Sequence, residues 1–419
     1  MLDKMKQISL LAILFSIAVN GYSQNYTADF IKTVTVNTQE NINPILPLGK
    51  EIEFSFDDLE GDQKNYKYHI QHCDYNWNVS KLRSTEYLLG FESFEIQDIE
   101  NSFGTYQNYS HHKFTLPNIN TQIKISGNFL LTILNEEDEI CIQRRFIYYE
   151  PLVVLRGTIE RDRRLKSVNH TQTIKDQNQV VHFSILHPNT NINNPSKEIR
   201  IQIIQNNDWN TLKKDILPQY FKKNEIVYNY NSETSFSGNN EYLNFDTKNF
   251  NGTNVNIIKT ELKDHYYQTY LYPNTSRYFM PYTYYPDING GFVIRTLNGQ
   301  EASVDSEYTK VHFSLETNKD IIKNKTIYVY GAFNNYAFTE ENKLKHNQTT
   351  NYLETEILFK QGFYNYTYVI KEDNQKMDLK SIEGSFQETE NNYTILVYYK
   401  KFGERIERIV GALTLNSKN

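Results

Sequence analysis

Apolar and polar residues alternate along much of the chain, with a period of two. Apolar side chains at every second position are typical of β-strands that bury one face. The alternation is clearest at residues 52–56, 66–70, 199–203, 311–315, 364–370 and 393–399. Tyrosine and phenylalanine, present 33 and 24 times, favour such half-buried positions. Helical periodicity is limited to short candidates at 80–89 and 209–220. The pattern predicts an all-β fold.

Turns divide these strands into what we expect to be several domains. Segments rich in Asn, Gly and Pro, such as 186–196 and 236–240, separate the strands, and a chain of 419 residues suggests about three domains. Residues 181–185 (VHFSI) are similar to residues 311–315 (VHFSL), which places boundaries near Pro151 and Tyr308. We therefore expect an elongated array of about three immunoglobulin-like β-sandwich domains, at 25–150, 151–308 and 309–419.

The first 24 residues have the composition of a secretory signal peptide. Lys4 and Lys6 precede an apolar run from Ile8 to Val19, and small residues follow at the positions where a signal peptidase cuts. The run is too short for a membrane span, which needs about 20 residues. We expect cleavage after residue 23 or 24 and export of residues 25–419.

Charge and cysteine content narrow the function classes. The formal net charge of −6 argues against nucleic-acid binding, which requires a basic surface. The two cysteines, Cys73 and Cys141, are too few for a disulfide-stapled scaffold, and sequence leaves open whether they pair. We find no nucleophile elbow, HExxH motif, phosphate-binding loop or GxGxxG motif. We expect no enzyme activity and no cofactor.

Residues 69–78 (HIQHCDYNWN) contain the side chains that could form a metal site. On a strand, His69 and Cys73 would lie on one face, and His72 and Asp74 on the other. A tetrahedral zinc site needs its ligands to converge at about 2.0–2.3 Å, which this split opposes. We prefer a strand followed by a turn, with Trp77 packed in the first domain, and we expect no metal.

The segment 265–285 (HYYQTYLYPNTSRYFMPYTYY) is unusually rich in tyrosine. A protein core would favour Phe, Leu and Ile, because a buried hydroxyl needs a hydrogen-bond partner. Tyrosine in excess suits a surface that is wet in the free protein and covered in a complex. Packing within the fold remains the alternative for any one of these rings. The candidate partner-binding residues are Tyr278, Phe279, Tyr282, Tyr284 and Tyr285.

Several longer motifs, in order along the chain, resemble the type IX secretion system plug protein family. They are 73–77 (CDYNW), 84–91 (STEYLLGF), 101–103 (NSF), 109–118 (YSHHKFTLPN), 236–242 (FSGNNEY), 282–285 (YTYY), 287–290 (DING), 292–295 (FVIR) and 311–313 (VHF). The resemblance implies a periplasmic, non-enzymatic protein of Bacteroidetes-type bacteria. It would associate with the type IX translocon barrel of the outer membrane and sterically occlude the pore. It implies no nucleic acid, small-molecule substrate, metal or membrane insertion of its own.

A second resemblance concerns the last hundred residues. Residues 330–336 (YGAFNNY) and 362–366 (GFYNY) are similar to early-set immunoglobulin-like modules of the glycogen-binding type, although Tyr336 stands where those modules usually have Trp. The alternative function is therefore a periplasmic glycan-binding accessory protein, which would need an exposed aromatic platform within 309–419. A third interpretation is an outer-membrane barrel. The mean hydropathy of −0.64 disfavours the continuous apolar band that a barrel requires.

Overall fold

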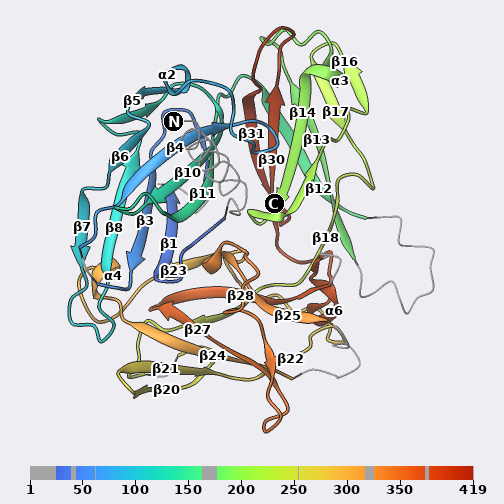
Figure 1. The fold of residues 1–419 in the computed structure, drawn as a ribbon. Helices are drawn as coiled ribbons and strands as arrows, with labels where there is room; N and C mark the ends of the chain where they lie inside the picture. Colours follow the sequence, from blue (N-terminus) through green and yellow to red (C-terminus); the bar gives the residue numbers. More distant parts are fainter. Residues whose placement is uncertain are drawn as a thin grey trace, which may run out of the picture.

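Strands form nearly all of the regular structure, and the all-β sandwich class expected from the sequence is confirmed. The computed structural model describes residues 25–38, 44–61, 63–162, 177–252, 254–316, 325–372 and 377–418. The predicted signal peptide, 1–24, lies outside the described residues. The strands form three lobes, each with its own hydrophobic core (Figure 1).

The first lobe contains two main sheets that share one core. Its elements are β1 (Ile31–Thr38), β2 (Ile45–Pro47), β3 (Ile52–Asp58), β4 (Lys67–Cys73), the one-turn helix α2 (Ser84–Tyr87), β5 (Leu88–Gly90), β6 (Ser93–Glu95), β7 (Asp98–Asn101), β8 (Ser110–Leu116), β9 (Thr121–Ile123), β10 (Gly127–Leu134) and β11 (Ile140–Tyr149). The sheets have the orders β1-β3-β8-β7 and β2-β11-β10-β4-β6. Phe54 from the first sheet and Ile70 and Phe129 from the second belong to the same buried cluster. These are apolar positions of the period-two pattern, which point to one face of each strand.

The second lobe combines strands from the middle and the end of the chain. Its elements are β12 (Val154–Arg161), β13 (Asn178–Leu186), α3 (Pro195–Glu198), β14 (Ile199–Gln205), β15 (Asp208–Lys214), β16 (Tyr220–Lys222), β17 (Glu225–Tyr228), β18 (Ser235–Ser237), β30 (Asn392–Tyr399) and β31 (Arg408–Asn416). One sheet has the order β12-β13-β17-β16, with β18 beside β13, and the other has the order β15-β14-β30-β31. Ile201 on β14 pairs with Val397 on β30, and both are fully buried in the core.

The third lobe is built from the chain between β18 and β30. Its elements are β19 (Leu243–Asp246), β20 (Ile257–Lys263), β21 (Tyr266–Leu271), β22 (Asn274–Thr275), β23 (Phe292–Ile294), α4 (Ala302–Asp305), β24 (Tyr308–Glu316), β25 (Thr326–Tyr330), the 3₁₀ turn η2 (Ala332–Asn334), β26 (Lys345–His346), β27 (Leu353–Lys360), β28 (Gly362–Lys371), β29 (Met377–Asp378) and α6 (Lys380–Glu383). One sheet has the order β20-β21-β24-β27-β26, with β22 also beside β24. In the other, β28 pairs with β19, β23, β25 and β29.

This strand pairing does not follow the expected boundary at 308/309. The C-terminal hairpin β30–β31 completes a sheet of the second lobe, whereas β19 to β23 belong to the third. The third lobe is thus inserted into the second, and the chain crosses between them near Gly238 and again near Phe386. A side chain at Gly238 would meet the Phe386 carbonyl oxygen at 2.1 Å, so only glycine fits this crossing. Local alternation predicts that strands exist, but the pairing of distant strands depends on tertiary contacts.

The lobes do not form the elongated array expected from the sequence. Each lobe contacts the other two, so the three close into a triangle (Figure 1). Hydrogen bonds that join the three pairs of lobes link Asp57 with Lys360, Tyr75 with Ile201, and Asp208 with Tyr330. In a linear array of three domains, the first and last domains would not contact each other. The sequence pattern predicts strands near the buried polar side chains that close the ring. It does not predict which residues these side chains bind.

A buried charge cluster joins the first lobe to the third. We call Asp57, His111, Tyr308 and Lys360 the Asp57 cluster. The Asp57 carboxylate is fully buried and accepts hydrogen bonds from the Lys360 ammonium at 2.7 Å and the Tyr308 hydroxyl at 2.6 Å. His111 Nδ1 lies 2.6 Å from its other oxygen. Burial alone would raise the pKa of Asp57, but Lys360 and His111 hold it below its usual value. The carboxylate therefore stays ionised and binds both lobes.

The CDYNW turn joins the first lobe to the second. The rings of Trp77 and Trp209 meet edge to face at 5.1 Å, and the Arg145 guanidinium lies over the Trp77 ring at 4.6 Å. The Tyr75 hydroxyl donates to the Ile201 carbonyl at 2.9 Å. Trp77 is buried as expected, but much of its packing crosses to the second lobe instead of staying within the first domain.

The second and third lobes meet at another buried carboxylate. Asp208 accepts hydrogen bonds from the Tyr330 hydroxyl at 2.6 Å and the Asn210 backbone N–H at 2.9 Å. The Tyr336 hydroxyl donates to the Asn206 carbonyl at 3.0 Å. Burial raises the pKa of Asp208 to about 6. Together, these contacts cover the YGAFNNY motif with the second lobe.

Removal of the cation from the Asp57 cluster should destabilise the protein strongly. We expect Lys360→Met to lower the free energy of unfolding by about 3–5 kcal/mol, because Asp57 would be left as a buried charge without its cation. Urea-induced unfolding followed by tryptophan fluorescence measures the change. Lys310→Met, which breaks the exposed pair with Glu356, is the matched control and should cost at most about 1 kcal/mol. Equal stability of the two variants would contradict the role of the cluster.

Truncation of Trp77 should weaken the interface between the first and second lobes. We expect Trp77→Ala to cost about 3–5 kcal/mol, as for a buried aromatic side chain. Because the two indole rings are in contact, Trp77→Ala and Trp209→Ala should be non-additive in a double-mutant cycle measured by thermal unfolding. Phe402→Ala is the control, because that ring is 95% exposed and its loss should be almost neutral. Full additivity would show that the rings stabilise the fold independently.

Candidate functional site

The five predicted partner-binding residues lie together in the loop between β22 and β23. We call residues 276–291 the tyrosine loop; it contains no helix or strand. Phe279 is 71% exposed and Tyr285 is 57% exposed, and Tyr284 is also exposed. Tyr278 and Tyr282 are half-buried. The structure therefore divides the predicted set into outward-facing rings and rings that contact the body of the protein.

Tyr282 is an anchor of the tyrosine loop. Its hydroxyl donates to the Glu241 carboxylate and lies 3.0 Å from the Glu388 carbonyl oxygen. Its ring lies 5.6 Å from that of Phe386, and the Lys418 ammonium lies over it at 5.6 Å. Burial and the Glu241 carboxylate both raise the pKa of Tyr282, so the hydroxyl remains a proton donor. These contacts fix the middle of the loop.

The base of the tyrosine loop is attached to the two segments at which the chain crosses between the second and third lobes, near Gly238 and Phe386. Arg277 Nε donates to the Glu383 carboxylate at 2.5 Å, and its Nη2 donates to the Glu241 carbonyl at 2.8 Å. The Tyr278 backbone N–H donates to the Ile382 carbonyl at 2.9 Å. The loop is thus held at both its base and its middle. Ordering it on binding would cost little entropy, which favours affinity for a partner.

A group of carboxylates lies at the C-terminal end of the tyrosine loop. The Asp287 carboxylate accepts hydrogen bonds from the backbone N–H groups of Tyr242 at 2.5 Å and Asn289 at 2.7 Å. Burial raises the pKa of Asp287 to about 7 against the lowering effect of these two bonds, and the nearby charges of Glu241 and Glu390 add smaller contributions in the same direction as burial. Deprotonation of Asp287 near neutral pH therefore adds a negative charge to an already acidic environment.

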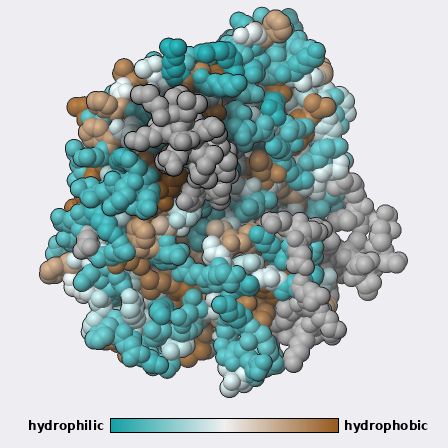
Figure 2. Space-filling view, in the orientation of Figure 1, coloured by the Kyte–Doolittle hydropathy of each residue, from teal (hydrophilic) through white to brown (hydrophobic). Residues whose placement is uncertain are grey.

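Exposed aromatic side chains on a fixed loop form a surface suited to protein contact. Aromatic rings surrounded by polar groups are typical of interface hot spots. Tyr284 combines these features, since its hydroxyl lies 3.3 Å from a Glu390 carboxylate oxygen and its ring lies 5.0 Å from the Lys418 ammonium. On the face shown in Figure 2, hydrophilic residues predominate and apolar ones form scattered groups. Within the described residues, no helix is long and apolar enough to cross a membrane.

The HIQHCDYNWN segment is a strand and a turn. His72 is buried, and burial lowers its pKa to about 4, so the ring is neutral near pH 7. Asp74 Oδ1 accepts the backbone N–H groups of Asn76 at 2.8 Å and Asn78 at 2.9 Å, which closes the turn. Among the residues that the structure describes, no three His, Cys, Asp or Glu side chains gather as metal ligands would.

The two cysteines are free and occupy different hydrophobic clusters. Cys141 lies in the core of the first lobe, and Cys73 lies in the cluster shared with the second lobe. Burial raises the pKa of the Cys73 thiol to about 12 and that of Cys141 to about 11. Both side chains therefore act as small apolar residues in the fold.

Sequence reasoning missed the charged residues that support the loop. Glu241 is buried, and it belongs to the FSGNNEY motif. Asp287 opens the DING motif. The signal was available, since an acidic residue inside an otherwise neutral turn motif is unusual. Nothing in the sequence, however, indicated that these two motifs would meet at one loop, where the Tyr242 backbone N–H contacts Asp287, 45 positions later.

The tyrosine loop should become less protected as the pH rises through about 7. The raised pKa of Asp287 means that its contribution to stability is present in full below about 4, its unfolded value, and is lost as the pH rises through 7. We expect hydrogen exchange in residues 276–291, corrected for intrinsic rates, to be about tenfold faster at pH 8 than at pH 6.

Asp287→Asn is the matched variant, because the amide cannot titrate and keeps an oxygen acceptor for one of the two backbone N–H groups. It should remove the pH dependence in this loop and leave exchange elsewhere unchanged. A pH dependence that persists in Asp287→Asn would assign it to another group.

Comparisons with known proteins give a family match for the first lobe and a similar structure for most of the chain. A family model described as the type 9 secretion system plug protein 1st domain matches residues 31–150. No curated protein matches the chain. The crystal structure of a hypothetical protein from Parabacteroides merdae is similar to this structure, with a TM-score of 0.87 and 29% sequence identity. The match covers 94% of this chain and 98% of the other, so it includes all three lobes. Residues 31–150 thus carry the first domain of the type 9 secretion system plug protein family, which confirms the family indicated by the sequence motifs.

Proposed function

We propose that this protein is a periplasmic plug that sterically occludes the translocon barrel of the type IX secretion system in the outer membrane. The observation that carries the proposal is that the family-matched first domain is joined by buried polar contacts to two further lobes in a closed body. Occlusion needs a stable shape and a complementary surface. It needs no catalytic group, and we infer a non-enzymatic role.

The closed triangle supports this role through its resistance to deformation. In a linear array, one lobe can swing away when one interface opens. In a ring of three lobes, displacing any lobe requires two interfaces to break. Here, one of these interfaces contains the ionised Asp57 and another contains the buried Asp208. A body of this kind can cover a pore without yielding to pressure from one side.

The tyrosine loop is the surface that we propose to contact the translocon barrel. Phe279, Tyr284 and Tyr285 supply the exposed rings, and Tyr278 and Tyr282 hold them in position. Amphipathic rings tolerate water in the free protein and provide large contact areas when covered. The sequence of residues 1–24 supports export to the periplasm, where the barrel would be reached without membrane insertion of the plug itself.

The glycan-binding alternative loses its main support at the YGAFNNY motif. Tyr330 is 1% exposed and Tyr336 is 5% exposed, because the second lobe covers both. Their hydroxyls bond to Asp208 and to the Asn206 carbonyl instead of facing solvent. Within the described part of 309–418, this motif offers no open aromatic platform for a sugar.

Removing two exposed rings of the tyrosine loop should release the plug. We expect the double variant Phe279→Ser/Tyr285→Ser to bind the barrel at least about thirtyfold more weakly, which corresponds to a loss of about 2 kcal/mol. The measurements are co-purification with the barrel and ion conductance through the barrel in planar bilayers. The variant should co-purify poorly and leave the pore conductive.

Phe402→Ser is the matched control, because Phe402 is 95% exposed at the opposite end of the β30–β31 hairpin from Lys418. It should co-purify and seal like the parent protein. Normal sealing by the double variant would show that the contact surface lies outside the tyrosine loop. A pore that stays closed when the plug is absent altogether would overturn the occlusion mechanism.

A further inference from the structure

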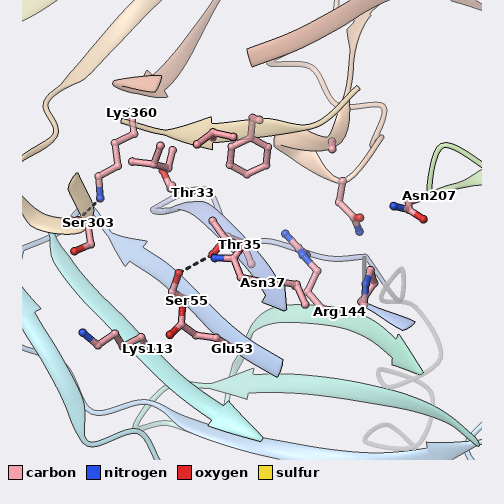
Figure 3. A pocket seen from close by; sticks show the side chains of 18 of the residues that line it. Thr33, Thr35, Asn37, Glu53, Ser55, Lys113, Arg144, Asn207, Ser303 and Lys360 are labelled. Carbon is pink, nitrogen blue, oxygen red and sulfur yellow. Dashed lines mark hydrogen bonds between the residues drawn. The ribbon is translucent and has the colours of Figure 1, made fainter. Parts of the chain in front are cut away.

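A cavity of about 510 Å³ lies where the three lobes meet (Figure 3). The first lobe contributes residues 33–37 of β1 and Arg144, the second contributes Asn207, and the third contributes residues 292–294 of β23 and Lys360. A second cavity of about 450 Å³ shares part of this lining, including Thr33, Arg144 and Lys360. The volume is typical of ligand sites in proteins, which range over about 300–1,000 Å³.

The edge of strand β1 faces this cavity. In the sheet order β1-β3-β8-β7, β1 is the first strand, and every residue after Ile31 is half-buried instead of alternating. Residues 33–37 line the cavity together with Ser55 of β3 and Lys113 of β8 on one side and Arg144 of β11 on the other. The cavity therefore extends from the outer face of this sheet around the edge of β1. A strand edge presents backbone N–H and C=O groups that can pair with another strand.

A second strand edge borders the same cavity from the third lobe. Strand β23 ends the sheet path β19-β28-β23, and all three of its residues line the cavity. Val293 is 44% exposed, although it lies in the middle of the strand. Edge strands from two different lobes thus line the same space.

Arg144 is a buried cation beside the cavity. Its Nη1 donates to the carbonyls of Tyr26 at 3.1 Å and Gln143 at 2.9 Å, and its Nη2 donates to Thr27 Oγ1 at 2.8 Å. The residue is 7% exposed, and no carboxylate among the described residues pairs with it. A buried charge without a counterion is costly, so an anionic group in the cavity would be favoured. Two of its five N–H donors are left for such a group.

The other cations of the lining already have partners. Lys113 pairs with Glu100 at 3.1 Å, Lys360 pairs with Asp57 at 2.7 Å, and the Arg145 guanidinium lies over the rings of Trp77 and Trp209. Figure 3 shows these two lysines on one side of the cavity and Arg144, close to Asn37, on the other. Arg144 therefore marks the end of the cavity at which an anion would bind.

We propose that this cavity binds an extended, carboxylate-bearing peptide segment, which adds as a strand beside β1 and places its carboxylate on Arg144. Regular pairing of β1 with β3 runs from Thr35 to Thr38, so the strand offers about 13 Å, or four residues, for such an addition. Backbone hydrogen bonds to an edge strand supply affinity for many sequences, and one charged contact fixes the register. This binding activity is independent of the proposed plugging role. The bound segment would touch all three lobes and stabilise the closed ring.

Calorimetric titration of the mature chain with a designed peptide tests the proposal. The probe is the acetylated hexapeptide Thr-Val-Thr-Val-Thr-Asp with a free terminal carboxylate. A neutral version ends in an asparagine amide, and a third version is N-methylated at every residue. We expect the charged probe to bind and to raise the melting temperature. The neutral probe should bind at least about tenfold more weakly, as for loss of a charge-assisted hydrogen bond. The N-methylated probe, which lacks backbone donors, should lose binding.

Arg144→Gln should weaken binding of the charged probe by a similar factor and leave binding of the neutral probe unchanged. The loss from the Arg144 substitution and the loss from the neutral probe should therefore not add. Lys401→Gln, an exposed charge outside the cavity, is the matched control and should bind like the parent protein. If Arg144→Gln fails to fold, the three peptides on the parent protein still decide the outcome. No binding of the charged probe at millimolar concentration overturns the proposal. Equal binding of the N-methylated probe overturns strand addition, and equal binding of the neutral probe overturns the role of Arg144.

Discussion

The buried carboxylate of Asp57 is the interaction on which the closed arrangement of lobes depends. It lies on β3 of the first lobe and binds a lysine that follows it by more than three hundred residues. A carboxylate of this kind cannot be left alone in the interior, because its desolvation costs several kcal/mol. Once the first lobe places Asp57 at its surface, the fold is stable only if the third lobe brings Lys360 and Tyr308 against it. The charge therefore specifies one docking geometry.

The insertion of the third lobe into the second also restricts how the lobes can be arranged. The chain leaves the second lobe after β18 and returns with β30, so the third lobe is tethered at both ends. Two crossings limit its rotation, and contacts with the first lobe remove the freedom that remains. The tyrosine loop lies beside these crossings, where Glu241 and Glu383 hold it to both. The rigidity of the proposed contact surface is thus a consequence of the topology.

The sequence predicted the strands well because alternation is a local property of a half-buried surface. It predicted neither the pairing of β14 with β30 nor the closed ring, since both depend on contacts between residues more than one hundred positions apart. The CDYNW motif was correctly interpreted as a turn, but its partner Trp209 could not be identified from spacing. The tyrosine loop was located, yet only the structure separates the anchor Tyr282 from the exposed Phe279.

Tyrosine has two roles in this protein, and composition alone cannot separate them. The largest fully buried side chains are tyrosines, and several of their hydroxyls cross between lobes. Examples are Tyr308 to Asp57, Tyr330 to Asp208 and Tyr398 to Asn128. A phenylalanine at these positions would fill the same space and leave the partner group without its donor. The property that suits tyrosine to an exposed contact surface, an apolar ring with one polar end, suits it equally to a seam between lobes. Only the position of the hydroxyl partner, inside the fold or outside it, decides which role a given tyrosine has.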